Sequence, residues 1–73
     1  MVLDLIVIKT DDGFTAEVPS IKGCECWAHD EDTVLEKIFV LTAFYLNLDL
    51  KKMKLDRARV IDQTTVYKLL FDK

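Results

Sequence analysis

The sequence is poor in the residues that mark metal sites, phosphate-binding loops and disulfide frameworks. Its 73 residues include two glycines, one proline, two cysteines and one histidine. Two glycines cannot build a glycine-rich phosphate loop, and one histidine with two cysteines falls short of the four ligands of a structural zinc site. Cys24 and Cys26 are two residues apart on a predicted strand, a spacing that makes an awkward disulfide. We therefore expect two structural thiols, no metal and no cofactor.

Positive charge, long apolar runs and a basic N-terminal segment are also missing. The net charge at pH 7 is −3, and a chain without a basic surplus is poorly suited to bind nucleic-acid phosphates. The longest apolar run, residues 38–46, is far too short to cross a bilayer. Residues 1–4 lack the basic segment of a secretion signal. These features predict a soluble, cytoplasmic protein that binds neither nucleic acid directly nor a membrane.

Hydrophobic residues, by contrast, are abundant for so short a chain. They make up 51% of the sequence, beside 32% charged residues. A single domain of this length has too little volume to bury all the apolar surface that such a composition supplies. We therefore expect a homo-oligomer, either a dimer or a larger assembly, or a complex with another protein. The acidic balance suits a basic protein partner, although it is equally consistent with ordinary solubility.

The first 28 residues predict three short strands. Residues 2–10 are rich in β-branched residues and apolar on both alternating sides, which predicts a central strand covered on both faces. Residues 11–13 predict a hairpin turn in which Gly13 takes a positive φ. Residues 14–18 alternate between apolar and polar side chains, as expected of a strand with one solvated face.

The segment 17–24 changes the direction of the chain before the third strand. Pro19 fixes its own φ and has no N–H to donate, so it predicts the end of the second strand. Gly23 predicts either a special backbone angle or a close approach that a Cβ atom would prevent. We expect this segment to position Trp27 and the helix that follows.

The third strand, residues 24–28, carries the only tryptophan of the chain. Alternation places Glu25 and Trp27 together on the polar side of this strand. Two interpretations of Trp27 remain open. It either packs beside Thr15 as surface cover or anchors a protein partner.

A helix is predicted from Asp30 to about Asn47 or Leu48. Asp30 suits the N-cap position, and the two acidic residues after it complement the helix dipole. Apolar residues recur at helical spacing and predict one inward stripe. The stripe comprises Val34, Leu35, Ile38, Leu41, Thr42, Tyr45 and Leu46. Phe39, Val40 and Phe44 add more apolar surface than one sheet face needs, which is a second indication of association.

The C-terminal third predicts a connection followed by a final strand. Residues 49–63 are mixed, and their pattern fits a short strand as well as a broken helix, with Met53, Leu55 and Ile61 expected to point inward. Residues 64–71 alternate and predict the last strand. The order of elements indicates a single domain of the α+β class, a small antiparallel β-sheet with one main helix packed on one face.

The sequence offers few residues that could form a catalytic site. His29 precedes the helix cap without a nucleophile or an orienting group at a recognisable spacing. The carboxylates of residues 30–32 are expected to cap the helix and complement its dipole rather than to bind metal. Asp4, Asp12 and Glu17 lie on strands that suit a metal-dependent nuclease, but their arrangement is not convincing. We therefore predict no catalytic residue and no enzymatic activity.

The order of the short sequence motifs along the chain is more informative than any single motif. These motifs are Asp12-Gly13-Phe14, Ala16-Glu17-Val18-Pro19, Ile21, Gly23-Cys24, Asp30 and Tyr45-Leu46. In this order they resemble the HicB-like domain, the antitoxin of HicA–HicB type II toxin–antitoxin modules. The resemblance covers residues 2–48. No helix-turn-helix or ribbon-helix-helix pattern follows, so the chain is similar to the solitary HicB-like domains, and operator binding is not expected.

The resemblance implies a β-β-β-α-β domain with a partial RNase H-like fold that lacks the catalytic carboxylates of RNase H. It also implies a dimer or larger oligomer. In complete toxin–antitoxin modules, domains of this family bind a small basic toxin, an mRNA interferase, and mask its active site. The expected function is therefore a non-catalytic, antitoxin-like protein-interaction module. The alternatives are a structural or small-ligand-binding oligomer and a residual RNase H-type nuclease.

Two sets of residues follow from this interpretation. The expected interface residues are Trp27, Glu25, Phe39 and Phe44. The residues expected to support the fold are Gly13, Pro19, Gly23, Cys24 and Asp30.

Overall fold

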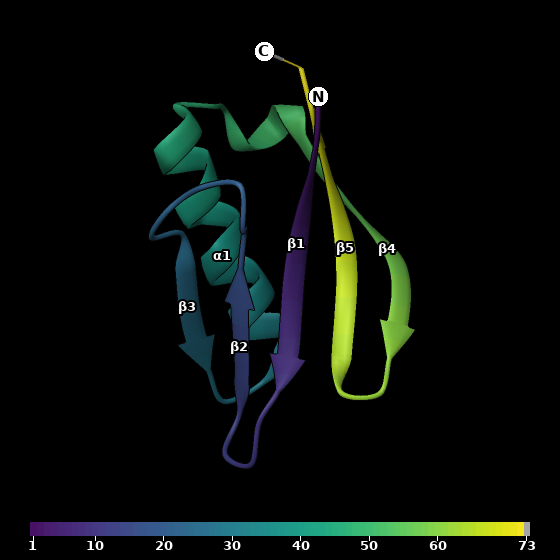
Figure 1. Ribbon diagram of the computed structural model, residues 1–73. Coiled ribbons are helices and arrows are strands. Elements are labelled where there is room, and N and C mark those ends of the chain that lie inside the picture. The colour runs from purple at the N-terminus through teal and green to yellow at the C-terminus, as the bar shows by residue number, and fades with distance from the viewer. Residues whose placement is uncertain (73) are drawn as a thin grey trace.

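The chain folds into one five-stranded antiparallel sheet with a helix across one of its faces (Figure 1). The computed structural model describes residues 1–72. The elements are β1 (Val2–Lys9), β2 (Phe14–Glu17), β3 (Glu25–Ala28), α1 (Glu31–Leu46), a 3-10 turn η1 (Leu50–Lys52), β4 (Met53–Ile61) and β5 (Thr64–Phe71). The strands lie in the order β3-β2-β1-β5-β4. The predicted α+β class is confirmed, but β4 adds a strand to the expected β-β-β-α-β order.

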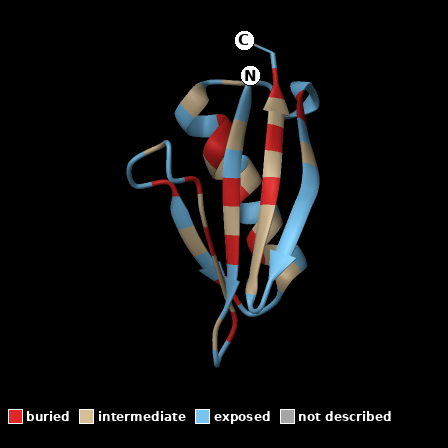
Figure 2. Cartoon of the chain, turned by 45° about the vertical axis from the view of Figure 1, so that its right-hand side comes forward, coloured by how far each residue is buried: buried red, intermediate tan, exposed pale blue. Residues whose placement is uncertain are grey.

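β4 occupies the stretch whose structure the sequence left undecided. It is an edge strand, and most of its residues are exposed, so the alternation that marks a half-buried strand is faint (Figure 2). Met53 is buried and Leu55 half-buried on the helix side, as expected. A β-bulge between Arg57 and Arg59 then reverses the alternation. Ile61 consequently faces away from the helix and is 53% exposed, so the prediction that it points inward was wrong.

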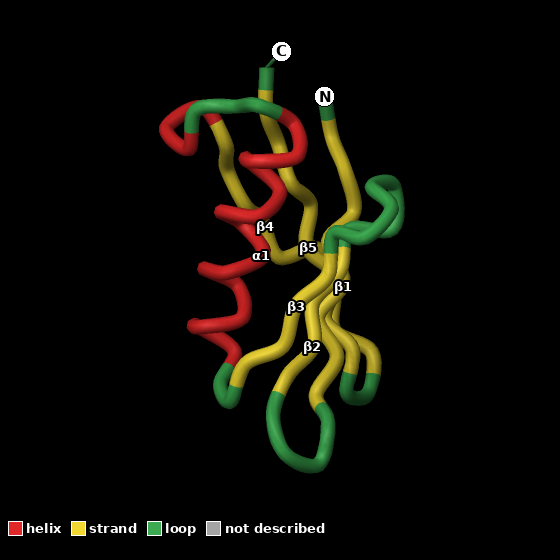
Figure 3. Tube along the Cα trace, turned by 90° about the vertical axis from the view of Figure 1, so that its left-hand side faces the viewer, coloured by secondary structure: helices red, strands yellow, loops and turns green. Residues whose placement is uncertain are grey.

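β1 is the central strand of the sheet, between β2 and β5, as predicted. Its side chains Leu5 and Val7 are buried on the helix side. On the opposite side, Val2 is 56% and Ile8 38% exposed. Figure 3 shows α1 on one side of the sheet only. Within residues 1–72, nothing covers the second face of β1, so the expectation of cover on both faces was wrong for the single chain.

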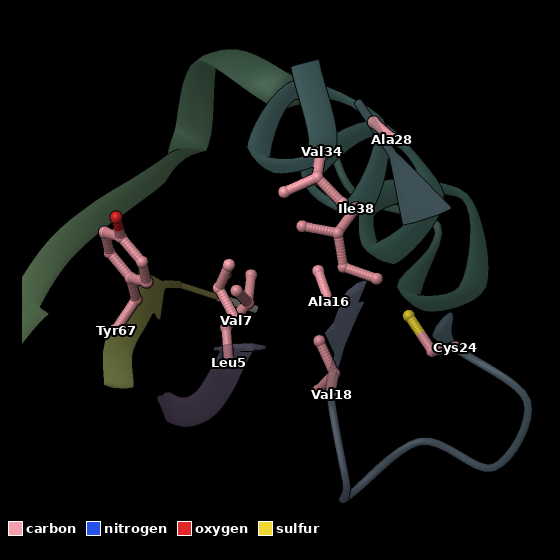
Figure 4. Packing of buried hydrophobic residues seen from close by; sticks show 9 residues of the cluster. All are labelled: Leu5, Val7, Ala16, Val18, Cys24, Ala28, Val34, Ile38 and Tyr67. Atoms are coloured by element: carbon pink, nitrogen blue, oxygen red, sulfur yellow. The ribbon is translucent and has the colours of Figure 1, made fainter. Parts of the chain in front are cut away.

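The main core lies between α1 and the inner face of the sheet, which is the face that α1 covers. Figure 4 shows helix side chains directed toward residues from β1, β2 and β5. The buried cluster comprises Leu5, Val7, Ala16, Val18, Cys24, Ala28, Val34, Ile38 and Tyr67. Complete burial of one such aliphatic side chain stabilises a fold by roughly 1.5–3 kcal/mol. Alternate strand residues and one helix stripe therefore supply most of the packing.

A second cluster continues the core under the C-terminal half of α1. It comprises Ala43, Met53, Leu69 and Phe71, with Phe39 and Leu46 packed against it. The buried stripe of the helix therefore turns toward β4 and β5 along its length. Ala43, outside the predicted stripe, is buried for this reason, whereas Tyr45 is 47% exposed. The prediction that Tyr45 points inward was wrong.

Both ends of α1 have the caps that their residues favour. The Asp30 carboxylate accepts a 2.8 Å hydrogen bond from the backbone N–H of Thr33, which lowers the pKa of Asp30. The helix ends at Asn47, which takes the left-handed φ of 55° and directs its N–H to carbonyl oxygens of the last turn. The predicted bounds of the helix are confirmed.

The two glycines serve different purposes from one another. Gly23 has a φ of 83°, one of the two requirements that the sequence left open for it. Gly13 does not have the expected positive φ. A Cβ atom there would lie 2.8 Å from the Trp27 ring and would also strike the carbonyl oxygen of Ala28. Gly13 is therefore required by a close approach, and the hairpin closes through the 2.7 Å bond from Thr10 N to Gly13 O.

Candidate interaction surfaces

The outer face of the sheet, opposite α1, carries two rows of side chains that run across all five strands. The register aligns the first row in the order Ile61, Thr64, Ile8, Thr15 and Trp27. It aligns the second row in the order Arg59, Val66, Ile6, Glu17 and Glu25. We call these the apolar row and the charge-ended row. The second has an apolar centre, a cation at the β4 edge and two carboxylates at the β3 edge.

Two further rows complete the outer face toward the other end of the strands. Asp56, Lys68 and Asp4 form a charged row, in which Lys68 and Asp4 make an ion pair. Beyond it lie Lys54, Leu70 and Val2. The outer face therefore divides into an apolar half, formed by the apolar row and the charge-ended row, and a charged half.

Trp27 is held in the apolar row by contacts on several sides. Its ring lies against Gly13 and makes an edge-to-face contact with His29 at a centroid distance of 4.6 Å. Its carbonyl oxygen is 3.4 Å from Nζ of Lys37 on α1. Trp27 pairs across the strands with Thr15, as one interpretation required, yet it is 39% exposed. Gly13 and His29 both contact its ring.

An open depression of about 560 Å³ lies beside Trp27, over β2 and β3. It is lined by Thr15, Ala16, Glu17, Glu25, Cys26 and Trp27. Glu17 and Glu25 face each other across the two strands, and like charges in this position destabilise strand pairing. Among residues 1–72, the only ion pair within 4 Å is that of Asp4 with Lys68. The two carboxylates of the depression thus make no ion pair with any residue in the described range.

The other two expected interface residues lie on α1, away from Trp27. Phe39 is half-buried and packs against the second core cluster. Phe44 is 79% exposed and contacts Tyr45 edge to face. The structure therefore brings Trp27 and Glu25 together on the outer face, leaves Phe44 on the helix surface and assigns Phe39 to the core. Sequence reasoning missed Ile8, Arg59 and Ile61 as surface candidates, although the apolar second side of β1 was a signal for Ile8.

One end of the molecule is strongly acidic. The β1–β2 hairpin, the β4–β5 turn and the start of α1 all lie there (Figure 1). The backbone N–H of Lys9 donates a hydrogen bond to the carbonyl oxygen of Gln63 and so joins the β1–β2 hairpin to the β4–β5 turn. The carboxylates at this acidic end are Asp11, Asp12, Asp30, Glu31, Asp32 and Asp62. Lys9 is the one lysine beside them in the shallow depression of about 170 Å³ between β1, the β4–β5 turn and α1.

Two titratable groups on the inner side of the sheet have raised pKa values. Burial raises the pKa of the Cys26 thiol, which donates weakly to the carbonyl oxygen of Val34. Burial and the neighbouring negative charge of Glu31 raise the pKa of Tyr67, whose hydroxyl donates to a Glu31 carboxylate oxygen at 3.2 Å. Cys24 and Cys26 are both free. The raised pKa makes the Cys26 thiol a poor nucleophile at neutral pH.

The carboxylates considered for a nuclease are not assembled into a metal site. Within residues 1–72, no three His, Cys, Asp or Glu side chains are grouped closely enough to hold a metal ion. Asp4 pairs with Lys68, and Asp12 accepts a hydrogen bond from the Thr10 hydroxyl. Glu17 lies beside Glu25 on the outer face.

No protein-family model, curated protein or solved structure matches this chain. The resemblance to HicB-like domains thus rests on the residues quoted for it and stays a prediction. Within residues 1–72, no helix has the length and apolarity needed to cross a bilayer.

Proposed function

We propose that this chain is a non-catalytic, antitoxin-like interaction module that self-associates and binds a small basic protein. The acidic end carries the proposal, because six of the 13 acidic residues of the chain gather there from two turns and the start of α1. Such a concentration of one charge creates a field that accelerates association with an oppositely charged surface. The resemblance to HicB-like antitoxins supports the same kind of partner.

The mode of inhibition follows from the chemistry of such a partner. A toxin that cleaves RNA needs a basic surface to bind the phosphate backbone. When the acidic end binds this surface, its carboxylates pair with the basic side chains that would otherwise bind the RNA phosphates. The RNA is thereby excluded. The chain then needs no catalytic group of its own, and binding should weaken as ionic strength rises.

The proposal is tested with a small basic protein whose gene lies beside the gene for this chain. Co-expression should relieve the growth arrest that this protein causes, and the purified pair should bind in a salt-sensitive manner. The triple variant Asp11→Asn, Asp32→Asn and Asp62→Asn should weaken binding by about tenfold or more, since it removes three charges from the acidic end.

The matched control removes the same charge from elsewhere on the surface. Glu36→Gln, Asp56→Asn and Asp72→Asn neutralise three exposed carboxylates away from the acidic end. This control should retain nearly full affinity and full relief of growth arrest. Equal losses in the two triple variants, or no binding by the unmodified chain, would remove the acidic end as the binding surface.

A second candidate function is small-ligand binding by an oligomer. The depression of about 560 Å³ beside Trp27 favours it, because ligand pockets commonly have volumes of about 300–1,000 Å³. Its test is a screen of small molecules for quenching of the fluorescence of the single tryptophan, with Trp27 variants as blanks.

A further inference from the structure

The apolar half of the outer face lacks a cover within the chain. A sheet with one solvated face normally presents polar residues there, yet Ile6, Ile8 and Val66 occupy the middle of the apolar half. At its two edges, Trp27 is 39% and Ile61 53% exposed. Four strands thus contribute apolar side chains to the same half of this face, with Thr64 and Thr15 between them, and exposed apolar side chains gathered in this way mark an interaction site.

We infer that a second copy of this chain covers this face in a two-fold symmetric dimer. The two sheets pack face to face, and the dyad runs nearly parallel to β1, so that the central strands of the two copies oppose each other. The inference rests on the self-association included in the proposed function and gives it a surface and a geometry. The acidic end remains outside the interface and free for a basic partner.

Symmetry decides which side chains meet in this dimer. A dyad along the central strand places each row against the same row of the second copy, with its order across the strands reversed. Ile8 then meets Ile8 of the second copy. Trp27, at the β3 edge, lies opposite Ile61 at the β4 edge of the other chain. The apolar row of each copy therefore covers the apolar row of the other copy.

The charge-ended row is complementary to itself under the same operation. Glu25, at one end of this row, lies opposite Arg59 at the other end of the row in the second copy. Glu17 and Glu25 make no ion pair with residues 1–72, and the open depression that they line faces this incoming arginine. The β-bulge at Arg57/Arg59 brings Arg59 and Ile61 onto the outer face, where they can enter the depression.

The alternative dyad, perpendicular to the strands, gives a poorer match. It sets the apolar half of one copy against the charged half of the other, so that Ile6 opposes the row of Asp4 and Lys68. In that arrangement Asp4 and Lys68 would lose solvent against Ile6 and Val66, Glu25 would find no cation, and only Arg59 would meet an opposite charge, at Asp56, so the match is unfavourable. The dyad parallel to β1 instead sets the charged half against itself, where Lys68 already pairs with Asp4 within each copy.

The available surface is adequate for a stable dimer. The molecule measures 36 × 21 × 20 Å, and the sheet extends along its long axis. A face of these dimensions matches the roughly 800 Å² per partner that a standard interface buries. Two twisted sheets pack in this manner with their strands about 30° apart and a separation of about 10 Å.

The test measures molecular mass by sedimentation velocity across a range of concentrations. The unmodified chain should be a dimer. Ile8→Glu places two carboxylates opposite each other at the dyad and should raise the dissociation constant by about 100-fold or more. The control Val40→Glu changes an apolar residue on α1 that is 50% exposed, against 38% for Ile8, and should leave the dimer intact. Circular dichroism verifies that both variants are folded.

A charge exchange tests the orientation without altering the apolar residues. Arg59→Glu and Glu25→Arg should each weaken the dimer about tenfold, and the double variant should recover most of the loss, because each pairs only with the other. A dimer that survives Ile8→Glu, or a double variant no better than the single ones, would overturn the proposed interface. A monomer at all concentrations would overturn self-association itself, while binding of a basic partner, measured with the acidic-end variants, would be unaffected.

Discussion

The two faces of the sheet are built from the same strands but differ greatly in how well their apolar side chains are buried. On the inner face, α1 buries side chains from every strand of the sheet. On the outer face, the apolar row remains partly exposed from Ile61 to Trp27. Alternation in a strand shows which residues need cover, but it does not show which element provides it. One helix of 16 residues suffices for one face only.

Polar groups show the same contrast. On the inner side, the Thr42 hydroxyl donates to the carbonyl oxygen of Ile38 at 2.6 Å, and Tyr67 donates to Glu31. No buried side-chain nitrogen or oxygen among residues 1–72 lacks a hydrogen-bond partner. On the outer face, Glu17, Glu25 and Arg59 make no ion pair within the described chain. The polar groups of the inner face are satisfied within the described residues, whereas the charges of the outer face next to its apolar side chains are not paired there.

The largest effect is expected from a cavity on the inner face. Ile38 is fully buried between α1 and the sheet, so Ile38→Ala should lower the free energy of unfolding by about 2–5 kcal/mol in urea titrations. Ile8→Ala on the outer face should cost less at low protein concentration and more as the dimer forms. Equal losses from the two variants at every concentration would show that the faces do not differ as described.

An intermediate effect is expected at Gly13, which lies beneath the Trp27 ring. A methyl group at this position must displace the ring or the β3 backbone, so Gly13→Ala should destabilise the fold by about 1–3 kcal/mol. The tryptophan emission should shift as the indole moves. Gly23→Ala is the matched control, because its strain comes from a positive φ. It should destabilise the protein without changing the emission of Trp27.

A smaller effect is expected at alkaline pH, and it belongs to the inner face. The folded-state pKa values of Cys26 and Tyr67 lie above their ordinary values of 9.0 and 10.0. Their contribution to stability is therefore complete below pH 9 and is lost as pH rises through the folded-state values. The thermal midpoint should fall above pH 9. In Cys26→Ala, the first part of this decline should vanish; an unchanged decline would contradict the assignment.

The smallest effect is expected at acid pH from the helix cap. The folded-state pKa of Asp30 is below its ordinary value of 3.8, so its contribution is present above that pH and is lost as pH falls through the lower value. Asp30→Asn retains a cap that accepts the hydrogen bond but does not titrate there. The variant should show a shallower loss of stability below pH 4. A loss as steep as in the unmodified chain would assign the acid sensitivity to other carboxylates.

Local patterns predicted most of the secondary structure because these elements depend on neighbouring residues. The cap at Asp30, the end of α1 and the alternation of β5 were all correct. β4 was undecided, because an edge strand with exposed residues lacks the hydrophobic period on which such predictions depend. The error at Ile61 came from the bulge, which depends on pairing with β5 and leaves no mark in the sequence of β4.

The candidate surfaces were predicted only in part. Glu25 and Trp27 were placed together correctly, since they alternate on a single strand. Arg59 is distant from them in sequence, and only the register through β5, β1 and β2 aligns it with Glu25. Phe39 and Phe44 are equivalent as apolar helix residues, but the packing of the C-terminal strands under α1 separates a core residue from a surface residue.

The sequence by itself determined that this chain is acidic and rich in apolar residues, and it located the first three strands and the helix to within one or two residues. These properties follow from composition and from interactions within a few residues. Only the tertiary structure decided which apolar residues remain exposed and which charges align with them. The reason is that exposure depends on contacts between distant segments, here on a sheet with five strands and a single helix to cover it.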